Sequence, residues 1–451
     1  MKIVIAYTAI YAAACAAASF HVDILAAVLL TTAAVGVFVY EYLRTGNVLN
    51  LRGLFTLGFT GGQGLSCLKL SYLQTEWNIK TWAAFFLAWA GIYFGYDLCR
   101  TIIGRYDKKR GGKVLPAVRP DRNRLFICII ALTAVNTAAF ILEAAVLGYI
   151  PLFVRGVPHA YSEFHISGVH YFTVSSVLVP AFVCVWADSF REEGDGPFSY
   201  LKRLPVRQTA VMIICMAAGY AIPLLCVSRF QFAFAMALQL FTILLITQNS
   251  LGKEKRVYIL KLLVISAAVL LPAYLLLSAA RSHDAEYLNS IFEMRYDLPI
   301  FISHPYIYIA NNYDNFNCLV NELPEHTWGL RMLFPVWALT GLKFIRPELV
   351  NFPIFVTKTE LTTVTLFYDA YYDFGLAGVL GFALFIGILL YCAERLVWER
   401  DDRAAVPVYA QLGGYMALAF FTTWFSNPTT WFYLGVSMII YVICVFMKGR
   451  K

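Results

Sequence analysis

Long apolar runs separated by short polar or basic connections are the main pattern along this chain. A helix needs about 20 apolar residues to cross the hydrocarbon core of a bilayer. Because a lipid-embedded backbone must satisfy its own hydrogen bonds, the runs predict an all-α fold, a polytopic transmembrane helix bundle of about twelve spans. The expected spans cover residues 3–19, 23–42, 53–71, 81–99, 125–146, 170–189, 209–226, 231–248, 258–279, 366–393, 407–425 and 430–447.

Lysine and arginine residues predict the orientation of these spans. Cytoplasmic connections of membrane proteins carry an excess of both residue types. With both termini placed in the cytoplasm, the inner connections hold most of the 36 basic residues, and the connection 100–124 is the most basic. Residues 147–169 and 280–365 then lie outside. We expect a single integral membrane domain over residues 1–451, in which 280–365 is a long extracytoplasmic loop that contains short helices and forms part of the active site.

Composition agrees with a membrane protein. The 451 residues are 60% hydrophobic and only 14% charged, and the mean hydropathy is +0.65. Soluble proteins carry roughly 25% charged residues, so a soluble globular enzyme is excluded. The net charge of +8 is explained by the inner connections, and we expect no nucleic-acid partner. The ten cysteines form no CxxC pair and are expected as buried thiols.

Four arginines lie close to the expected outer surface, where topology does not require positive charge. They are Arg155, Arg229, Arg281 and Arg295. The guanidinium group is suited to two-point contact with phosphate. We therefore predict that these residues bind a pyrophosphate, the alternative being side chains that reach to lipid headgroups. Arg229 is the sharpest candidate, because its short apolar hairpin holds it in the interface.

Acid and base candidates gather in the shorter outer segment and at the start of the longer one. The segment 158–165 packs His159, Tyr161, Glu163 and His165 into eight residues, and Asp284 follows Arg281. Glutamate, aspartate and histidine are the usual general bases, so Glu163, His165 and Asp284 are candidate catalytic residues. A solvated loop role is the alternative for each. The spacings match no metal-ligand signature, so no metal or cofactor is expected.

Two further stretches combine amide, carboxylate and aromatic side chains. Residues 311–317 contain four asparagines with Tyr313 and Phe316, and residues 366–375 contain Tyr368, Asp369 and Asp373. The (i, i+4) spacing of Asp369 and Asp373 predicts that both face one side of a helix. Amides and carboxylates read sugar hydroxyls, and aromatic faces stack on pyranose rings. A helix end and an aromatic belt at the membrane surface are the respective alternatives. The predicted glycan-binding residues are His159, Tyr161, Tyr313, Asn315, Tyr368 and Asp369.

Several short motifs occur in a fixed order along the chain: the run 148–153 (Gly-Tyr-Ile-Pro-Leu-Phe), the Ser228-Arg229 hairpin, the Asn-Tyr-Asp-Asn-Phe-Asn core of 311–317, and the run 371–378 (Tyr-Tyr-Asp-Phe-Gly-Leu-Ala-Gly). In these motifs, and in its many spans, inward termini and dominant late outer loop, the chain resembles the oligosaccharide repeat unit polymerases, the O-antigen polymerase (Wzy-type) family. The resemblance covers most of the chain.

The resemblance implies a metal-independent glycosyltransferase of the bacterial cytoplasmic (inner) membrane. Such enzymes join undecaprenyl-pyrophosphate-linked oligosaccharide repeat units into a surface polysaccharide on the outer face, and they are expected to work with a chain-length regulator and a flippase. By position, Arg155, Arg229 and Arg281 resemble the arginines that engage pyrophosphate in related enzymes, and Arg295 matches less closely. A lipid-linked glycan ligase, another polyprenyl-dependent glycosyltransferase, and a lipid-linked oligosaccharide flippase or transporter are the alternatives. A transporter is expected to carry charge near mid-bilayer, where Glu143 is the nearest candidate.

Overall fold

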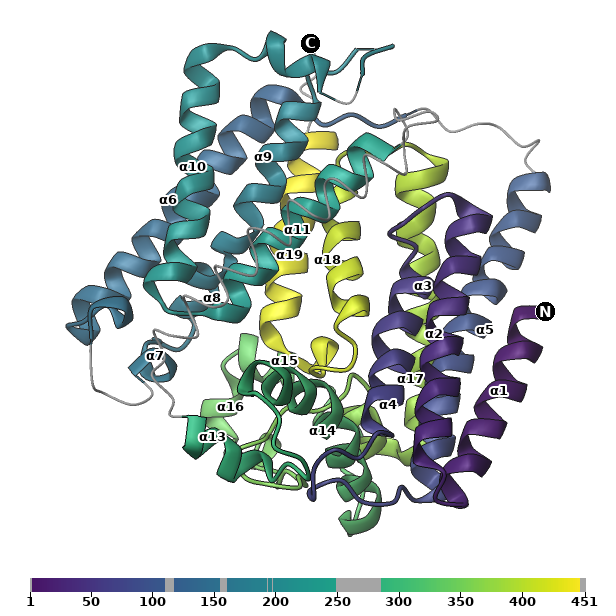
Figure 1. Cartoon of the computed structure of the whole chain (residues 1–451). Helices are drawn as coiled ribbons and strands as arrows, with labels where there is room; N and C mark the ends of the chain where they lie inside the picture. Colours follow the sequence, from purple (N-terminus) through teal and green to yellow (C-terminus); the bar gives the residue numbers. More distant parts are fainter. Residues whose placement is uncertain are drawn as a thin grey trace. The chain divides into compact units, whose positions relative to one another are not determined.

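The computed structural model describes residues 2–109, 117–154, 160–192, 194–196, 198–248 and 285–446 (Figure 1). In these residues the regular elements are helices, and the one β contact is an isolated antiparallel bridge between Ser71 and Met294. The all-α fold expected from the sequence is therefore confirmed.

Seven of the described helical segments are long and apolar enough to cross a membrane, as expected of a multi-pass membrane protein. They are α2 (Asp23–Thr45), α6 (Arg122–Leu147), the joined segment Val169–Asp188, α10 (Val206–Leu225), α11 (Arg229–Thr247), α17 continued to Glu399 (Tyr368–Glu399) and α19 (Pro428–Val445).

The expected count of twelve spans is not confirmed, and the chain shows why. The helix α1 (Lys2–Ser19) and the helix α18 (Val406–Ala417) are short, while α5 (Ile79–Lys109) is long but rich in Trp and Tyr, which lower its mean hydropathy. In place of the expected span 53–71, α3 (Leu51–Phe55), the π turn η1 (Thr56–Thr60) and α4 (Gly61–Ser66) follow one another without a break and form a shorter helix that ends at Ser66. The expected span 258–279 lies outside the described residues.

Contacts gather in two compact units. Unit 1 comprises Met1–Val114, His283–Glu394 and Tyr415–Trp431, and unit 2 comprises Leu115–Ser282, Arg395–Gly414 and Phe432–Lys451. The chain leaves and re-enters each unit, so the division follows contacts rather than sequence order. Each unit is considered by itself below.

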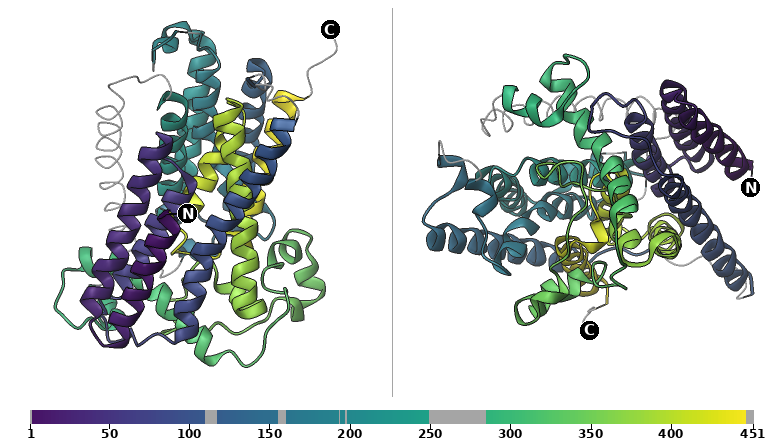
Figure 2. Two further views of the ribbon diagram at one scale, coloured as in Figure 1. Left: turned by 90° about the vertical axis from the view of Figure 1, so that its right-hand side faces the viewer. Right: turned by 90° about the horizontal axis from the view of Figure 1, so that it is seen from below.

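Long helices form one side of unit 1, where α1 and α2 lie side by side and α5 packs along α17 (Figure 2). Glycines allow the α5 and α17 backbones to approach closely. A Cβ on Gly95 would lie 2.3 Å from the Leu384 carbonyl oxygen, and one on Gly387 would lie 2.3 Å from the Ile92 carbonyl oxygen. Small residues at helix crossings are typical of membrane proteins.

Glycines in η1 and α4 also allow close approach. A Cβ on Gly58 would lie 2.2 Å from the Ala417 carbonyl oxygen, and one on Gly62 would lie 2.6 Å from the Tyr313 hydroxyl oxygen. Backbone and side chains from distant parts of unit 1 therefore occupy the space that side chains would need. Close approach, rather than a weakened helix alone, accounts for the glycines here.

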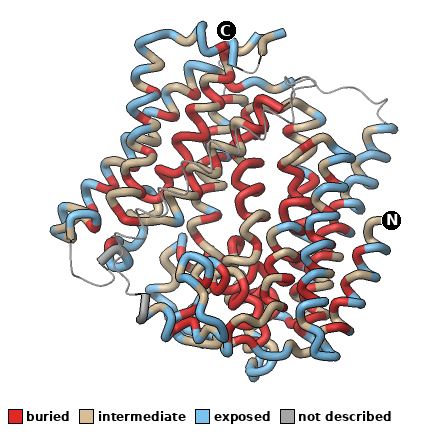
Figure 3. Tube along the Cα trace, in the orientation of Figure 1, coloured by how far each residue is buried: buried red, intermediate tan, exposed pale blue. Residues whose placement is uncertain are grey.

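The segment expected as a long loop carries α13 (Ala285–Phe292), α14 (Ile300–Glu322), α15 (Phe334–Leu339), α16 (Leu342–Ile345) and the 3₁₀ turn η6 (Pro347–Leu349). Of these, α14 is longer than the short helices expected. It lies at the end of unit 1 where α1 turns into α2 (Figure 1). Residues 310–317 of α14 are buried, in a region that Figure 3 shows largely in the buried colour.

Unit 2 contains α6, α10, α11, most of α19 and the segment α8 (Val169–Val174), η3 (Ser175–Leu178) and α9 (Val179–Asp188). Local sequence sets the ends of α6. The Asp121 carboxylate accepts a hydrogen bond from the Arg124 amide at 3.0 Å, and Gly148 ends the helix with φ of 78°. Near that end, Phe140, Phe164, Ile222 and Cys226 form a hydrophobic cluster that joins α6, the connection before α8, and α10.

Candidate functional site

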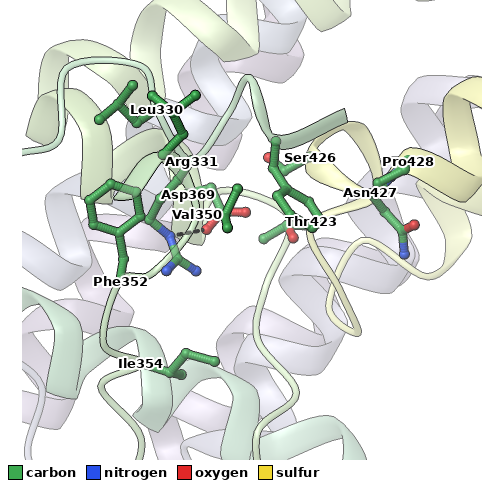
Figure 4. A pocket seen from close by; sticks show the side chains of 12 residues that line it. Leu330, Arg331, Val350, Phe352, Ile354, Asp369, Thr423, Ser426, Asn427 and Pro428 are labelled. Carbon is green, nitrogen blue, oxygen red and sulfur yellow. Dashed lines mark hydrogen bonds and ion pairs between the residues drawn. The ribbon is translucent and has the colours of Figure 1, made fainter. Parts of the chain in front are cut away.

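A cavity of about 360 Å³ opens within unit 1 (Figure 4). Its lining is mostly apolar but includes an arginine–aspartate pair, two hydroxyl groups and an amide, and for these groups it is called the polar cavity below. Pockets for small ligands commonly span 300–1,000 Å³. Three stretches of chain line it: residues from 330 to 354, the first turn of α17, and the connection before α19. The lining residues that carry the argument are Arg331, Phe352, Asp369, Thr423, Ser426 and Asn427.

An ion pair forms one wall of this cavity. The Nε atom of Arg331 donates to Oδ1 of Asp369 at 2.7 Å, and the two side chains are 17% and 7% exposed. The guanidinium also lies over the ring of Tyr372, with its carbon 4.5 Å from the ring centroid. Burial alone would lower the pKa of Arg331, but the charge and hydrogen bond of Asp369 and the nearby Tyr368 and Tyr372 together outweigh burial and raise this pKa. The arginine is therefore held in its charged form.

The rest of the guanidinium remains available to a ligand. Among the described residues, the bond to Asp369 is the one hydrogen bond that this side chain makes, and it uses only Nε. In Figure 4 the guanidinium of Arg331 reaches into the cavity, while Thr423, Ser426 and Asn427 stand on another side of it. The cavity thus presents charged donors, hydroxyl groups and an amide to one space.

A second carboxylate places Arg331. Asp373 is fully buried and accepts hydrogen bonds from the Thr327 hydroxyl, from the Met332 amide at 2.8 Å and from the Arg331 amide at 3.2 Å. Residues four apart lie on one face of a helix. Asp369 and Asp373 accordingly face the same loop, residues 327–332, from the one helix face that their spacing predicted. Asp373 binds the backbone of this loop, and Asp369 binds the side chain of Arg331.

A second, apolar cavity of about 570 Å³ lies in the same unit. Several of its lining residues are sequence neighbours of residues in the polar cavity: Met332 follows Arg331, and Phe425 precedes Ser426. Most of its lining comes from α17: Phe374, Ala377, Gly378, Gly381, Phe382 and Phe385. Leu333 and Trp431 complete the lining, together with Met332 and Phe425. A polar and an apolar cavity thus share two short stretches of chain.

The predicted glycan-binding residues of α14 lie elsewhere. Tyr313 is fully buried and donates to the Phe59 carbonyl oxygen. Asn315 is also fully buried: its amide nitrogen donates to the carbonyl oxygens of Leu361 at 2.7 Å and Thr363 at 2.8 Å, and its oxygen accepts from the Thr357 amide at 2.8 Å. Both side chains hold the fold together and present no atom to either cavity. We therefore leave them out of the candidate site.

Of the other predicted residues in unit 1, Tyr368 and Asp369 belong to the cavity region. Tyr368 exchanges hydrogen bonds with the backbone of Phe355, at 2.8 and 3.0 Å, which positions the stretch of chain beside the cavity. Arg295 is exposed, and its Nε donates to the Ser71 carbonyl oxygen at 3.2 Å. The structure thus places Arg295 against residues 70–72, and it is absent from the lining of both cavities.

The other described candidates belong to unit 2. Glu163 ends the short helix α7 (Ala160–Glu163), and His165 follows it; both are exposed. Arg229 begins α11, directly after a tight turn in which Val227 has φ of 53°. Arg155, His159, Arg281 and Asp284 lie outside the described residues, and the side chain of Tyr161 is not described.

Sequence reasoning missed Arg331. It is one of several basic residues in the expected outer loop, and 38 residues separate it from Asp369. No local motif distinguishes it from its neighbours. Within the described ranges, no three His, Cys, Asp or Glu side chains are placed to hold a metal ion.

Comparisons with protein-family models, with curated proteins and with solved structures each give no match to this chain. The candidate site is therefore argued from its own residues and geometry.

Proposed function

We propose that the protein is a membrane glycosyltransferase that joins oligosaccharide repeat units carried on a polyprenyl pyrophosphate. The observation that carries the proposal is the Arg331–Asp369 pair, which faces a polar cavity within a helical membrane protein. The motifs that occur in sequence from the 148–153 run to the 371–378 run, and that resemble those of oligosaccharide repeat unit polymerases, support the same reaction.

The cavity suits a sugar for a specific chemical reason. A pyranose offers hydroxyl groups that both donate and accept, and these match the free guanidinium nitrogens of Arg331 and the groups of Thr423, Ser426 and Asn427. The ring of Phe352 adds an aromatic surface for the apolar face of the sugar. We assign this cavity to the glycan, and the apolar cavity to part of the polyprenyl chain.

The transfer itself needs charge stabilisation more than covalent catalysis. An acceptor hydroxyl attacks the anomeric carbon from the side opposite the pyrophosphate, which leaves with the bonding electrons. This displacement inverts the configuration at the anomeric carbon. Guanidinium groups offset the charge that develops on the leaving oxygen. Arg155, Arg229 and Arg281 are proposed for this role from their positions in the sequence, with Arg295 as the weaker candidate. We place the reaction at the outer face of the bacterial inner membrane, with both termini cytoplasmic.

The test is reconstitution of the purified full chain in lipid vesicles with a synthetic polyprenyl-pyrophosphate-linked repeat unit. We expect a ladder of glycans that differ by one repeat unit, without added metal. A single transfer onto an unrelated lipid acceptor would indicate a ligase instead. Movement of the intact lipid-linked unit across the vesicle membrane, with no new glycosidic bond, would indicate a flippase.

A further inference from the structure

Unit 2 contains a carboxylate that the proposed reaction has not yet used. Glu143 lies one turn before the end of α6 and is fully buried. It accepts hydrogen bonds from the Ile166 amide at 2.9 Å, from the Thr173 hydroxyl at 2.7 Å and from Nδ1 of His170 at 3.1 Å. Ionisable residues within membrane helices are costly and usually functional, so this one needs an explanation.

The contact with Glu143 fixes the ring of His170. An ionised carboxylate only accepts hydrogen bonds, so Nδ1 of His170 must carry the proton. In the neutral ring Nε2 then has the free electron pair, and it has no hydrogen-bond partner among the described residues. The side chain is 31% exposed, so one edge of the ring is buried against Glu143 and the other edge can be reached. Such an arrangement makes a histidine a proton acceptor.

The surroundings of this pair contain several of the residues predicted from sequence. The ring centroid of His165 lies 6.2 Å from that of His170, and Glu163 is two residues before His165. On the α10 side, Cys226 lies within electrostatic range of Glu143, and Arg229 follows three residues later at the start of α11. The titratable groups that face the pair therefore come from α6, from the connection before α8 and from the end of α10.

We propose that His170 is the general base of the transfer step and that Glu143 is its positioning residue. The inference rests on the proposed function and names the proton acceptor of that same reaction. The O–H proton of the acceptor hydroxyl passes to Nε2 of His170 while the oxygen forms its bond to the anomeric carbon. The bond from that carbon to the pyrophosphate breaks, and the pyrophosphate leaves with the electron pair.

His170 suits this role better than the two bases predicted from the sequence in its neighbourhood. Nδ1 of His165 lies 3.2 Å from the Ser162 carbonyl oxygen, a local contact within an exposed turn. Glu163 is itself exposed. Of His165, Glu163 and His170, all within the described part of the chain, His170 is the one held by a buried carboxylate, and orientation is what makes a base effective in a transition state.

The chain offers a matched control for the pair. Nδ1 of His21 lies 2.9 Å from Oε1 of Glu76, which is the same contact between the same groups. These two side chains are 69% and 66% exposed, at the turn after α1 and in the connection before α5. A surface pair of this kind is screened by water and orients its histidine weakly.

The experiment combines kinetics and spectroscopy on the reconstituted full chain. His170→Gln is expected to lower polymer formation about 100-fold or more, and to change the dependence of kcat/KM on pH relative to wild-type protein, because a general base contributes to that dependence. His21→Gln is expected to leave both unchanged. In protein labelled with ¹⁵N-histidine, the His170 resonances are expected to show the Nδ1–H form, and Glu143→Gln is expected to remove that preference while Glu76→Gln is not.

Each unfavourable outcome points to a different failure. A His170→Gln protein that keeps its rate and its pH profile would overturn the general-base assignment while leaving the polymerase proposal intact. His170 resonances in the Nε2–H form would show that Glu143 does not position a base. Wild-type protein that shows the Nδ1–H form but makes no polymer would contradict the proposed function, and with it the transfer role of His170.

Discussion

Asp314 of α14 and Asp369 of α17 are both buried carboxylates of unit 1, and each stands in a stretch that the sequence marks for sugar binding. Asp314 accepts from the Trp77 indole at 2.9 Å, from the Ser66 hydroxyl at 2.9 Å and from the Gln74 amide at 3.2 Å. Asp369 has the Arg331 side chain beside it and a cavity before it. The hydrogen bonds of Asp314 all go to other parts of the fold, whereas Asp369 lies next to a cavity that a ligand can occupy.

The difference arises from partners far away in the sequence. The donors of Asp314 come from residues 66–77, so these hydrogen bonds hold α14 against that distant stretch of unit 1. A neighbouring amide of α14 also bonds to a distant stretch of chain: the side-chain oxygen of Asn317 accepts from the Asn78 amide at 2.9 Å and from the Thr81 hydroxyl at 2.7 Å. A run of amides and aromatics is therefore no evidence of a ligand site until the hydrogen-bond partners of its side chains are known.

The largest effect on stability is expected when α14 loses one of these amides. Asn315→Ala leaves the carbonyl oxygens of Leu361 and Thr363 and the amide of Thr357 without their partner. Each unpaired buried polar group costs about 1–3 kcal/mol, so we expect the free energy of unfolding to fall by about 4 kcal/mol. Thermal or denaturant unfolding in detergent measures this change.

The matched control is Thr423→Val, which removes one hydroxyl from the cavity lining with little change of shape. It is expected to change the free energy of unfolding by less than about 1 kcal/mol. Equal stability losses in the two variants would show that α14 and the cavity do not differ as described.

A somewhat smaller effect is expected in the pH dependence of stability. Burial raises the pKa of Asp314 to about 6, although hydrogen bonds from Trp77, Gln74 and Ser66 oppose this shift. In the unfolded chain the pKa is about 3.9. Between pH 4 and pH 6 the folded protein therefore holds a proton that the unfolded chain has lost, so stability falls as pH rises through this window and the contribution levels off above it.

The size of that change is about 3 kcal/mol, from the two pKa values. Unfolding of wild-type protein from pH 4 to pH 7, compared with Asp314→Asn, measures it. The side-chain amide of this variant does not titrate, so the slope assigned to the carboxyl group should vanish even though the variant is less stable overall. A slope that persists unchanged in the variant would assign it to other groups.

The sequence predicted some features well because they depend on local pattern. Apolar runs identified the helical class and most helix positions, and the (i, i+4) spacing placed Asp369 and Asp373 on one face of α17. Other features depend on contacts across the chain. The apolar content of residues 53–71 predicted a span, but the close approaches at Gly58 and Gly62 belong to a shorter helix with a π turn that packs against distant residues.

The candidate site was only partly predictable for the same reason. Asp369 could be predicted because its own stretch combines carboxylate and tyrosine side chains. Arg331 has no such neighbours in sequence, and its role becomes visible only from its contacts with Asp369, Asp373 and Tyr372. His170 likewise has no distinguishing sequence signal at the start of its expected span, because its partner Glu143 is 27 residues away on another helix. Residues that act in pairs across helices leave little signal in a single sequence.

The most direct measurement of the central claim compares two arginine variants in the vesicle polymerisation assay. Arg331 pairs with Asp369 beside the cavity, whereas Arg346 pairs with Glu348 on the surface, where the side chains are 69% and 62% exposed. Arg331→Gln removes the charged donors from the cavity, and at about 1.5–3 kcal/mol per charged hydrogen bond we expect polymer formation per folded molecule to fall about 100-fold. Arg346→Gln is expected to stay within about twofold of wild type, because exposed pairs contribute little. A wild-type ladder from folded Arg331→Gln protein would contradict the account.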